Sequence, residues 1–299
     1  MSEIVVGMPQ MAYRGMSENW LFRHAGARHW DALCDSMGVE SNALVDADGR
    51  RVYSSFVAIQ AGFSEPLVGV RENDRFRETV DLSRFGQSIF SSVYSLAGAS
   101  ADLTLEMTTK FVARAKEGSN QLVQTTIRAA SPSTAPELDG PPVVTGRHRA
   151  LRGDALPARW EFDGRFLPLK AEDRVLELNA DPVATAIYEP TPYLDYNGAG
   201  LLYFASYPTI ADTLERRMVR DGGFSPVAGE WAQCSGTVAR EVYYYGNLDL
   251  GETVQAGMHA FRTVEGRDGA VALIHVRLCC KEDGRRIADI FTAKSVRGE

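Results

Sequence analysis

Apolar residues recur at helical spacing in two stretches that lie far apart along the chain, and each pattern predicts a helix. The first stretch covers residues 17–37 and opens with Ser17, a residue type that often caps a helix N-terminus. The second covers residues 199–217 and can present one broad buried face. The apolar positions are Trp20, Leu21, Trp30, Leu33, Cys34 and Met37 in the first stretch, and Leu201, Leu202, Phe204, Ala205, Ile210, Ala211 and Leu214 in the second.

An Asn197-Gly198 pair, followed by Ala199, stands directly before the second apolar stretch. Small residues let another backbone or a ligand come close. The first N–H groups of a helix are free to hold an anion or a polarised carbonyl oxygen. The sequence therefore offers Asn197 and Gly198 as candidate donors at a helix start. A core helix with a turn in front of it explains the same residues.

Strand patterns follow each predicted helix. Asp48-Gly49 lies between two strand-like runs in LVDADGRRVYSSFVAIQ and predicts a hairpin. Further strands are predicted in RFRETVDLSRF, QSIFSSVYSL, LTLEMTTKFVARA and QLVQTTIRAA, and in VALIHVRLCC near the C-terminus. The order of a turn-rich lead-in, a helix and then strands thus occurs twice.

Short residue matches support an internal repeat. Leu21, Asp31 and Leu33 match Leu202, Asp212 and Leu214 at an offset of 181 (202 − 21), Val52-Tyr53 matches Val242-Tyr243 at 190 (242 − 52), and Thr108-x-Lys110-x-Val112 matches Thr292-x-Lys294-x-Val296 at 184 (292 − 108). Each match is weak alone, and their common order is the evidence.

A proline-rich stretch separates the two copies. We predict an N-terminal unit at residues 1–128, a surface connector at 129–173 and a C-terminal unit at 174–299. One helix with four or five antiparallel strands is too small to bury both of its surfaces, but two such units can pair through edge strands. The predicted fold is therefore an α+β double hot-dog, with the two helices side by side at the centre. A pair of ferredoxin-like units would need more helices than the pattern supplies.

Composition excludes several classes of protein. The 299 residues carry a net charge of −7, which argues against a nucleic-acid-binding surface. The N-terminus MSEIVVGMPQ has no leader pattern and no apolar run approaches membrane-spanning length, so we expect a cytoplasmic protein with no membrane contact. The four cysteines show no metal-ligand spacing, and no glycine-rich phosphate loop follows a strand. We therefore expect no metal and no cofactor.

Two blocks of sequence, MPQMAYRGMSENWLFRHAGARHW and DYNGAGLLYFASYPTIADTLER, resemble blocks of the LnmK-like family. This resemblance spans most of the chain apart from the connector. These double hot-dog proteins are encoded beside polyketide and mixed polyketide–peptide assembly lines. The resemblance implies a bifunctional acyltransferase/decarboxylase that decarboxylates methylmalonyl-CoA, carries the acyl group on a tyrosine and delivers it to an acyl carrier protein. By position, that tyrosine falls on Tyr53. We also expect a homodimer as one possible assembly.

The implied reaction assigns roles to further residues. Loss of CO₂ from a malonyl-type thioester generates an enolate, which needs hydrogen-bond donors at the thioester oxygen. Asn197 and Gly198 are the expected donors. The expected substrate-binding residues are Ser17, Trp20, Tyr196, Ala199 and Phe204, and the substrate is a CoA or phosphopantetheine thioester. A free phenol has a pKa of about 10, so Tyr53 as a nucleophile would need a group or the enolate to take its proton.

Other hot-dog activities remain open at this point. A thioesterase commonly uses an acid on or near the helix, and Glu18 is the one obvious candidate in the first block. A dehydratase needs a histidine paired with an acid, and His24 and His29 lie on the first predicted helix. A non-catalytic module that binds a carrier protein would keep the fold without organised polar groups.

Overall fold

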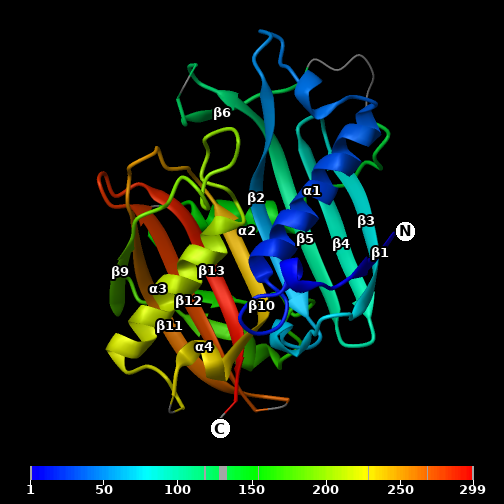
Figure 1. Cartoon of the computed structure of the whole chain (residues 1–299). Coiled ribbons are helices and arrows are strands. Elements are labelled where there is room, and N and C mark those ends of the chain that lie inside the picture. The colour runs from blue at the N-terminus through cyan, green and yellow to red at the C-terminus, as the bar shows by residue number, and fades with distance from the viewer. Residues whose placement is uncertain are drawn as a thin grey trace.

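The computed structural model describes residues 2–117, 119–127, 133–153, 155–227, 229–267 and 269–297. Two long helices, α1 (Glu18–Met37) and α3 (Ser206–Gly222), lie on one face of an 11-stranded antiparallel sheet (Figure 1). No helix in these ranges is long and apolar enough to span a membrane. The other elements are α2 (Val143–Leu151), α4 (Trp231–Cys234), β1 (Ser2–Val5), β2 (Val52–Phe63), β3 (Arg75–Phe85), β4 (Ile89–Gly98), β5 (Asp102–Arg114), β6 (Leu122–Gln124), β7 (Arg159–Glu161), β8 (Val175–Glu177), β9 (Ala184–Tyr188), β10 (Ser235–Tyr244), β11 (Val254–Gly266), β12 (Gly269–Cys280) and β13 (Arg286–Val296).

The sheet consists of two halves with the same connectivity. Its strand order is β1-β3-β4-β5-β2-β10-β13-β12-β11-β9, and the short β6 pairs with β5 outside this order. In each half, the strand that follows the long helix pairs with the last long strand of that half (β2 with β5, β10 with β13), and β2 joins β10 in the middle. This arrangement confirms the predicted α+β double hot-dog and excludes the ferredoxin-like alternative.

The strand register corrects the residue matches that suggested the repeat. A bulge interrupts β2 between Phe56 and Ala58 and interrupts β10 between Thr237 and Ala239, so these strands align at an offset of 181 (237 − 56). Phe56 pairs with Thr109 and Thr237 pairs with Lys294, which places Thr109 opposite Lys294 in the alignment. The matches of Lys110 with Lys294 and of Tyr53 with Tyr243 are therefore wrong. A slip of one residue puts side chains on opposite faces.

Helix α1 begins and ends where its sequence predicts. The Ser17 hydroxyl accepts a hydrogen bond from the Trp20 N–H at 3.2 Å, and Gly38 ends the helix at φ 63°. Helix α3 begins at Ser206 rather than near residue 199, so the predicted start is wrong. Leu202 consequently lies before the helix, whereas Leu21 lies within α1, although their offset of 181 is the one at which β2 and β10 align. Residues 197–202 form a loop instead, which is closed by the Asn197 side chain.

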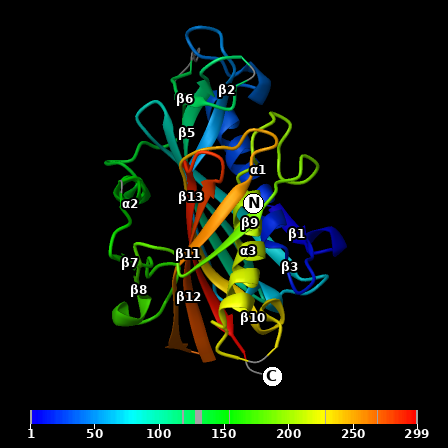
Figure 2. The same cartoon turned by 90° about the vertical axis from the view of Figure 1, so that its left-hand side faces the viewer.

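The predicted connector covers the sheet face opposite α1 and α3 (Figure 2). It contains α2 and β7, which pairs with β8 just beyond the connector, and its Trp160 stacks on Phe291 of β13 with ring centroids 4.5 Å apart. The segment is thus more ordered than the proline content suggested, because its aromatic residues complete a second hydrophobic core. The division at residues 128 and 129 lies outside the described residues, and the domain bounds stay a prediction.

The two long helices contact each other near their N-terminal ends. Asn19 Nδ2 of α1 donates to the Ala205 carbonyl at 2.9 Å and to Thr209 Oγ1 at 3.1 Å. Below them, the buried Arg240 of β10 bonds both Glu18 of α1 and Asp212 of α3. These contacts tie the two halves together on the helix side of the sheet.

Candidate active site in a cavity between the halves

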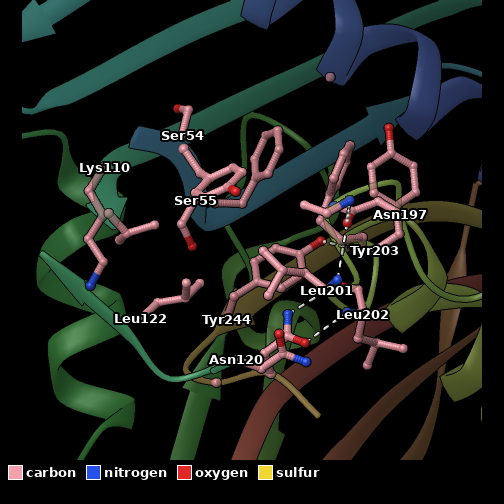
Figure 3. Close-up of a pocket in the computed structure, with 18 of the residues that line it drawn as sticks. Ser54, Ser55, Lys110, Asn120, Leu122, Asn197, Leu201, Leu202, Tyr203 and Tyr244 are labelled. Atoms are coloured by element: carbon pink, nitrogen blue, oxygen red, sulfur yellow. Dashed lines mark hydrogen bonds between the residues drawn. The ribbon is translucent and has the colours of Figure 1, made fainter. Parts of the chain in front are cut away.

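A cavity of about 1090 Å³ lies between the two halves of the molecule. Its walls come from α1, β2, β5 and the segment around β6 on one side, and from the loop before α3 and the end of β10 on the other. Figure 3 shows Ser54, Ser55 and Lys110 on one side of this space, and Asn197, Leu202 and Tyr203 on the other. A ligand in the cavity would therefore touch both hot-dog units.

The cavity lies where the central strands of the sheet stop pairing. Ala58 to Gly62 of β2 pair with Tyr243 to Ala239 of β10, and the bulge at Val57 ends this ladder. The earlier residues of β2 have no described partner on β10. Bulges commonly end pairing and re-aim side chains. Here both faces of β2 become accessible to the cavity.

One side of the cavity is aromatic and apolar. Phe56 of β2 stacks on Phe204 with ring centroids 4.0 Å apart. Gly26 of α1 permits this, because a Cβ on it would lie 2.3 Å from Phe204 Cζ. The hydroxyls of Tyr207 and Tyr244 also line the space, but they donate to the carbonyls of Gly246 and Phe204 respectively. Burial raises the pKa of both phenols, so neither is poised to ionise.

The other side of the cavity is polar. Side chains alternate along a strand, so Tyr53 and Ser55 face α2 while Ser54 and Phe56 face α1. Lys110 of β5 pairs directly with Ser55 and shares its face. Its amine has no hydrogen bond or ion pair to any described residue, and burial followed by the nearby charge of Arg152 lowers its pKa.

Hydrogen bonds from Arg114 and Asn120 connect the loop before α3 to the segment after β5. Arg114 donates to Asn120 Oδ1 at 2.7 Å and also to the Ala199 carbonyl. Asn120 Nδ2 donates to the Gly200 carbonyl at 3.0 Å. These bonds fix the position of residues 197–202 at the cavity wall.

Five of the residues expected to form the site do line the cavity: Tyr53, Asn197, Gly198, Ala199 and Phe204. The ring of Tyr53 lies 5.3 Å from the Arg51 guanidinium carbon, and its hydroxyl has no hydrogen bond within the described ranges. The roles predicted for these residues stay predictions.

The other three expected residues lie outside the cavity. Ser17 caps α1, and Trp20 stacks on His24 with ring centroids 5.0 Å apart. Tyr196 donates its hydroxyl to the Asp249 carbonyl at 3.0 Å. Ser17 and Trp20 were expected at the substrate, but they lie about two turns before Gly26, where α1 meets the cavity.

Two of the three N–H groups expected as donors at the Asn197-Gly198-Ala199 turn are already bonded within the loop. Asn197 Oδ1 accepts from the N–H groups of Ala199 at 2.9 Å and Leu201 at 3.1 Å. The Gly200 N–H donates to the Asn197 carbonyl at 2.8 Å. Among the described contacts, the Gly198 N–H and the side-chain nitrogen Nδ2 of Asn197 have no acceptor, so these are the donors that the loop leaves for a ligand.

The acid and histidine candidates are engaged elsewhere. Glu18 bonds Arg240 outside the cavity, and burial raises its pKa. His24 pairs with Glu78 at 2.6 Å, also outside the cavity. His29 lines the cavity, but both of its ring nitrogens bond hydroxyls, and burial lowers its pKa to about 4. Nowhere in the described ranges do three or more His, Cys, Asp or Glu side chains gather as a metal site would require.

Sequence analysis missed Ser55, Lys110, Arg114 and Asn120. The pairing of Ser55 with Lys110 depends on the β2–β5 register, which joins residues 55 positions apart (110 − 55). Arg114 and Asn120 belong to no recognisable motif. They were missed because their hydrogen bonds reach Ala199 and Gly200 in the other half of the chain. The strand alternation of RRVYSSFV offered one signal, since two adjacent serines interrupt an otherwise apolar strand.

No protein-family model matches the chain, and no curated protein matches its sequence. Solved structures do resemble it. A Lactobacillus plantarum protein assigned as an oleoyl thioesterase is 10% identical, with 100% of this chain and 96% of that one covered at a TM-score of 0.64. The 12:0-ACP thioesterase from Umbellularia californica is 10% identical, with 99% and 96% covered at a TM-score of 0.57. An acyl-ACP thioesterase from Bacteroides thetaiotaomicron is 12% identical, with 98% and 96% covered at 0.54. At identities this low, the structural similarity establishes a shared fold alone. The chain has the fold of these thioesterases over its whole length.

Proposed function

We propose that this protein is an enzyme that hydrolyses acyl thioesters and holds the acyl chain in the cavity between its halves. The observation that carries the proposal is the cavity itself, which has an aromatic side at Phe56 and Phe204 and a polar side at Ser55 and Lys110. Ligand sites are typically apolar clefts of this size with a few placed polar groups. Three proteins with the same fold are described as acyl thioesterases.

The acyl group would arrive on CoA or on the phosphopantetheine arm of an acyl carrier protein. The apolar side suits the acyl chain, and the polar side suits the thioester. Two of the similar structures are described as acting on carrier-protein thioesters, which supports a carrier protein as the partner.

Hydrolysis is expected when the protein is incubated with acyl-CoAs and acyl-carrier proteins of graded chain length, with free acid and free thiol as products. Leu201→Trp should fill part of the cavity and lower kcat/KM for the longest chains by roughly 10- to 200-fold, the range that one pocket contact supplies. Leu194→Trp is the matched control, because Leu194 is 68% exposed and outside the cavity. Thiol release and mass spectrometry measure both. Absence of hydrolysis with every thioester would reject the proposal.

A second candidate is decarboxylating acyl transfer through Tyr53, in polyketide or related natural-product biosynthesis. Its specific support is that Tyr53 lines the cavity with a hydroxyl free of described hydrogen bonds. This function predicts a propionyl adduct on intact wild type after mixing with methylmalonyl-CoA, and no adduct on Tyr53→Phe. Tyr13→Phe, at an 82% exposed position, should behave as wild type. An adduct that persists in Tyr53→Phe would move the nucleophile elsewhere.

A further inference from the structure

Ser55 and Lys110 form a directly opposed pair on neighbouring antiparallel strands at the polar side of the cavity (Figure 3). Directly opposed residues have Cβ atoms about 4.5–5.5 Å apart. The lysine stem adds four rotatable bonds, so its amine can reach the serine hydroxyl without backbone movement. No hydrogen bond joins them in this state, and apo sites often tighten only when substrate binds.

Two lysines of the chain are not exposed, Lys110 and Lys294, and Lys110 lacks a counter-ion in the described structure. Lys294, by contrast, bonds Asp212 at 2.9 Å and Glu215 at 2.6 Å, and these acids raise its pKa. Around Lys110, Arg152 directly after α2 adds like charge, and no described acid pairs with Lys110. A half-buried amine without an acid loses its proton more easily and can then act as a base.

We propose, building on the proposed thioester hydrolysis, that Ser55 is the nucleophile of this site and Lys110 is its general base. The Lys110 amine takes the proton of Ser55 Oγ as that oxygen attacks the thioester carbonyl. The tetrahedral intermediate collapses, its C–S bond breaks, and the thiolate leaves with the proton from Lys110. Ser55 is then acylated, and the amine is neutral again.

Water completes the cycle by the same route. Lys110 takes a proton from water as the hydroxide oxygen attacks the acyl-serine carbonyl. The ester C–O bond breaks, and Ser55 Oγ recovers the proton from Lys110. The products are the free acid and the free thiol, and no oxidant or other co-reactant is consumed.

The neighbouring hydroxyls fit this role less well. Ser54 points to the α1 face, where its hydroxyl is buried without a described partner. Tyr53 shares the face of Ser55 but lies opposite Val112, so Lys110 is its diagonal neighbour at about 7–8 Å. Ser55 is the hydroxyl that the register places directly across from the amine.

The test compares Ser55→Ala, Lys110→Met and Lys110→Arg with the wild type. Arginine keeps the positive charge but cannot lose its proton, so a base and a mere charge give different results. We expect all three variants to lose roughly 10²- to 10⁴-fold in kcat, the range for a positioned acid–base group. Lys170→Met and Ser95→Ala are matched controls at positions outside the cavity, and circular dichroism checks that every variant folds.

A fluorophosphonate probe supplies a second readout that needs no thioester. Labelling should occur on Ser55 and should vanish in Lys110→Arg. Fragment ions of the tryptic peptide at residues 52–71 separate Ser55 from Tyr53 and Ser54. Labelling of Ser55 without any thioester hydrolysis would reject the proposed function and keep this pair. Full hydrolysis in Ser55→Ala or Lys110→Arg, or labelling on Tyr53, would overturn the pair and keep the function.

Discussion

Arg240→Met is expected to lower the free energy of unfolding by up to about 3–5 kcal/mol, because Glu18 and the one-third exposed Asp212 lose their fully buried partner. Arg240 is fully buried and bonds Glu18 and Asp212 at 2.9 Å and Thr292 at 3.0 Å. Glu18 belongs to α1 and Asp212 to α3, so the guanidinium neutralises one acid from each half. Its removal leaves Lys294 as the remaining described cation bonded to this cluster. Urea unfolding followed by fluorescence and circular dichroism measures the loss.

Arg216→Met is the control for this change. Arg216 pairs with Glu230 at 2.5 Å on an exposed surface, where solvent screens the charges. We expect no change in its denaturation midpoint. An Arg240→Met protein as stable as wild type would show that the cluster contributes nothing to holding the halves together. A lowered m value in the same variant would indicate that the halves unfold separately.

Asp289→Asn is expected to cost a similar amount, about 3–5 kcal/mol near neutral pH. Asp289 is fully buried, and Arg277 holds both of its oxygens at 2.9 and 3.0 Å. His275 and Tyr245 complete its hydrogen bonds at 2.9 and 3.0 Å. An asparagine has one accepting oxygen and a donating NH₂ group, so Arg277 would lose one of its two acceptors and its charge partner.

The pH dependence of this effect has a defined sign. Burial alone would raise the pKa of Asp289, but the hydrogen bonds and charges of His275 and Arg277 outweigh it and hold the pKa well below its ordinary value. A depressed carboxyl pKa stabilises the fold above the unfolded value of about 3.9, and this contribution fades as pH falls through the folded value. The stability gap between wild type and Asp289→Asn should therefore narrow in acid. Asp221→Asn, an exposed control, should show no gap at any pH.

The elements set by local chemistry were predictable from sequence. Helix α1 has a serine cap at one end and a glycine at the other, and its bounds agree with the prediction. The start of α3 was not predictable in this way, since Leu201, Leu202 and Phe204 keep helical spacing through a loop. Gly200 at φ 68° and the isolated bridge between Tyr196 and Leu202 form a turn there in place of a helix.

The positions of β2, β3, β4, β5 and β12 were predicted from sequence, but those of β1, β9, β10, β11 and β13 were not, and neither was the strand register. The letters Thr-x-Lys-x-Val recur in β5 and β13, yet the bulges show that the two lysines face opposite sides of the sheet. A bulge shifts the pairing of two strands by one residue and moves the following side chains to the other face of the sheet. The strand pattern of this sequence alone does not show where the bulges lie. Tyr53 and Phe204 were expected as site residues and do line the cavity. The Ser55–Lys110 pair was not expected, because it depends on the register of β2 against β5.

The pairing of β2 with β10 at the centre of the sheet has a consequence for assembly and for how the two halves can diverge in sequence. Antiparallel pairing of two like edges has the local symmetry of a two-fold axis, which is the geometry of a dimer of identical subunits. A single half, expressed alone, would present one of these edges unpaired and would be prone to associate through it. Joining both halves in one chain removes the need for both edges to be identical. Each half can then change its side chains independently, so one can carry Phe56 beside the cavity while its counterpart carries Thr237 next to the buried Arg240.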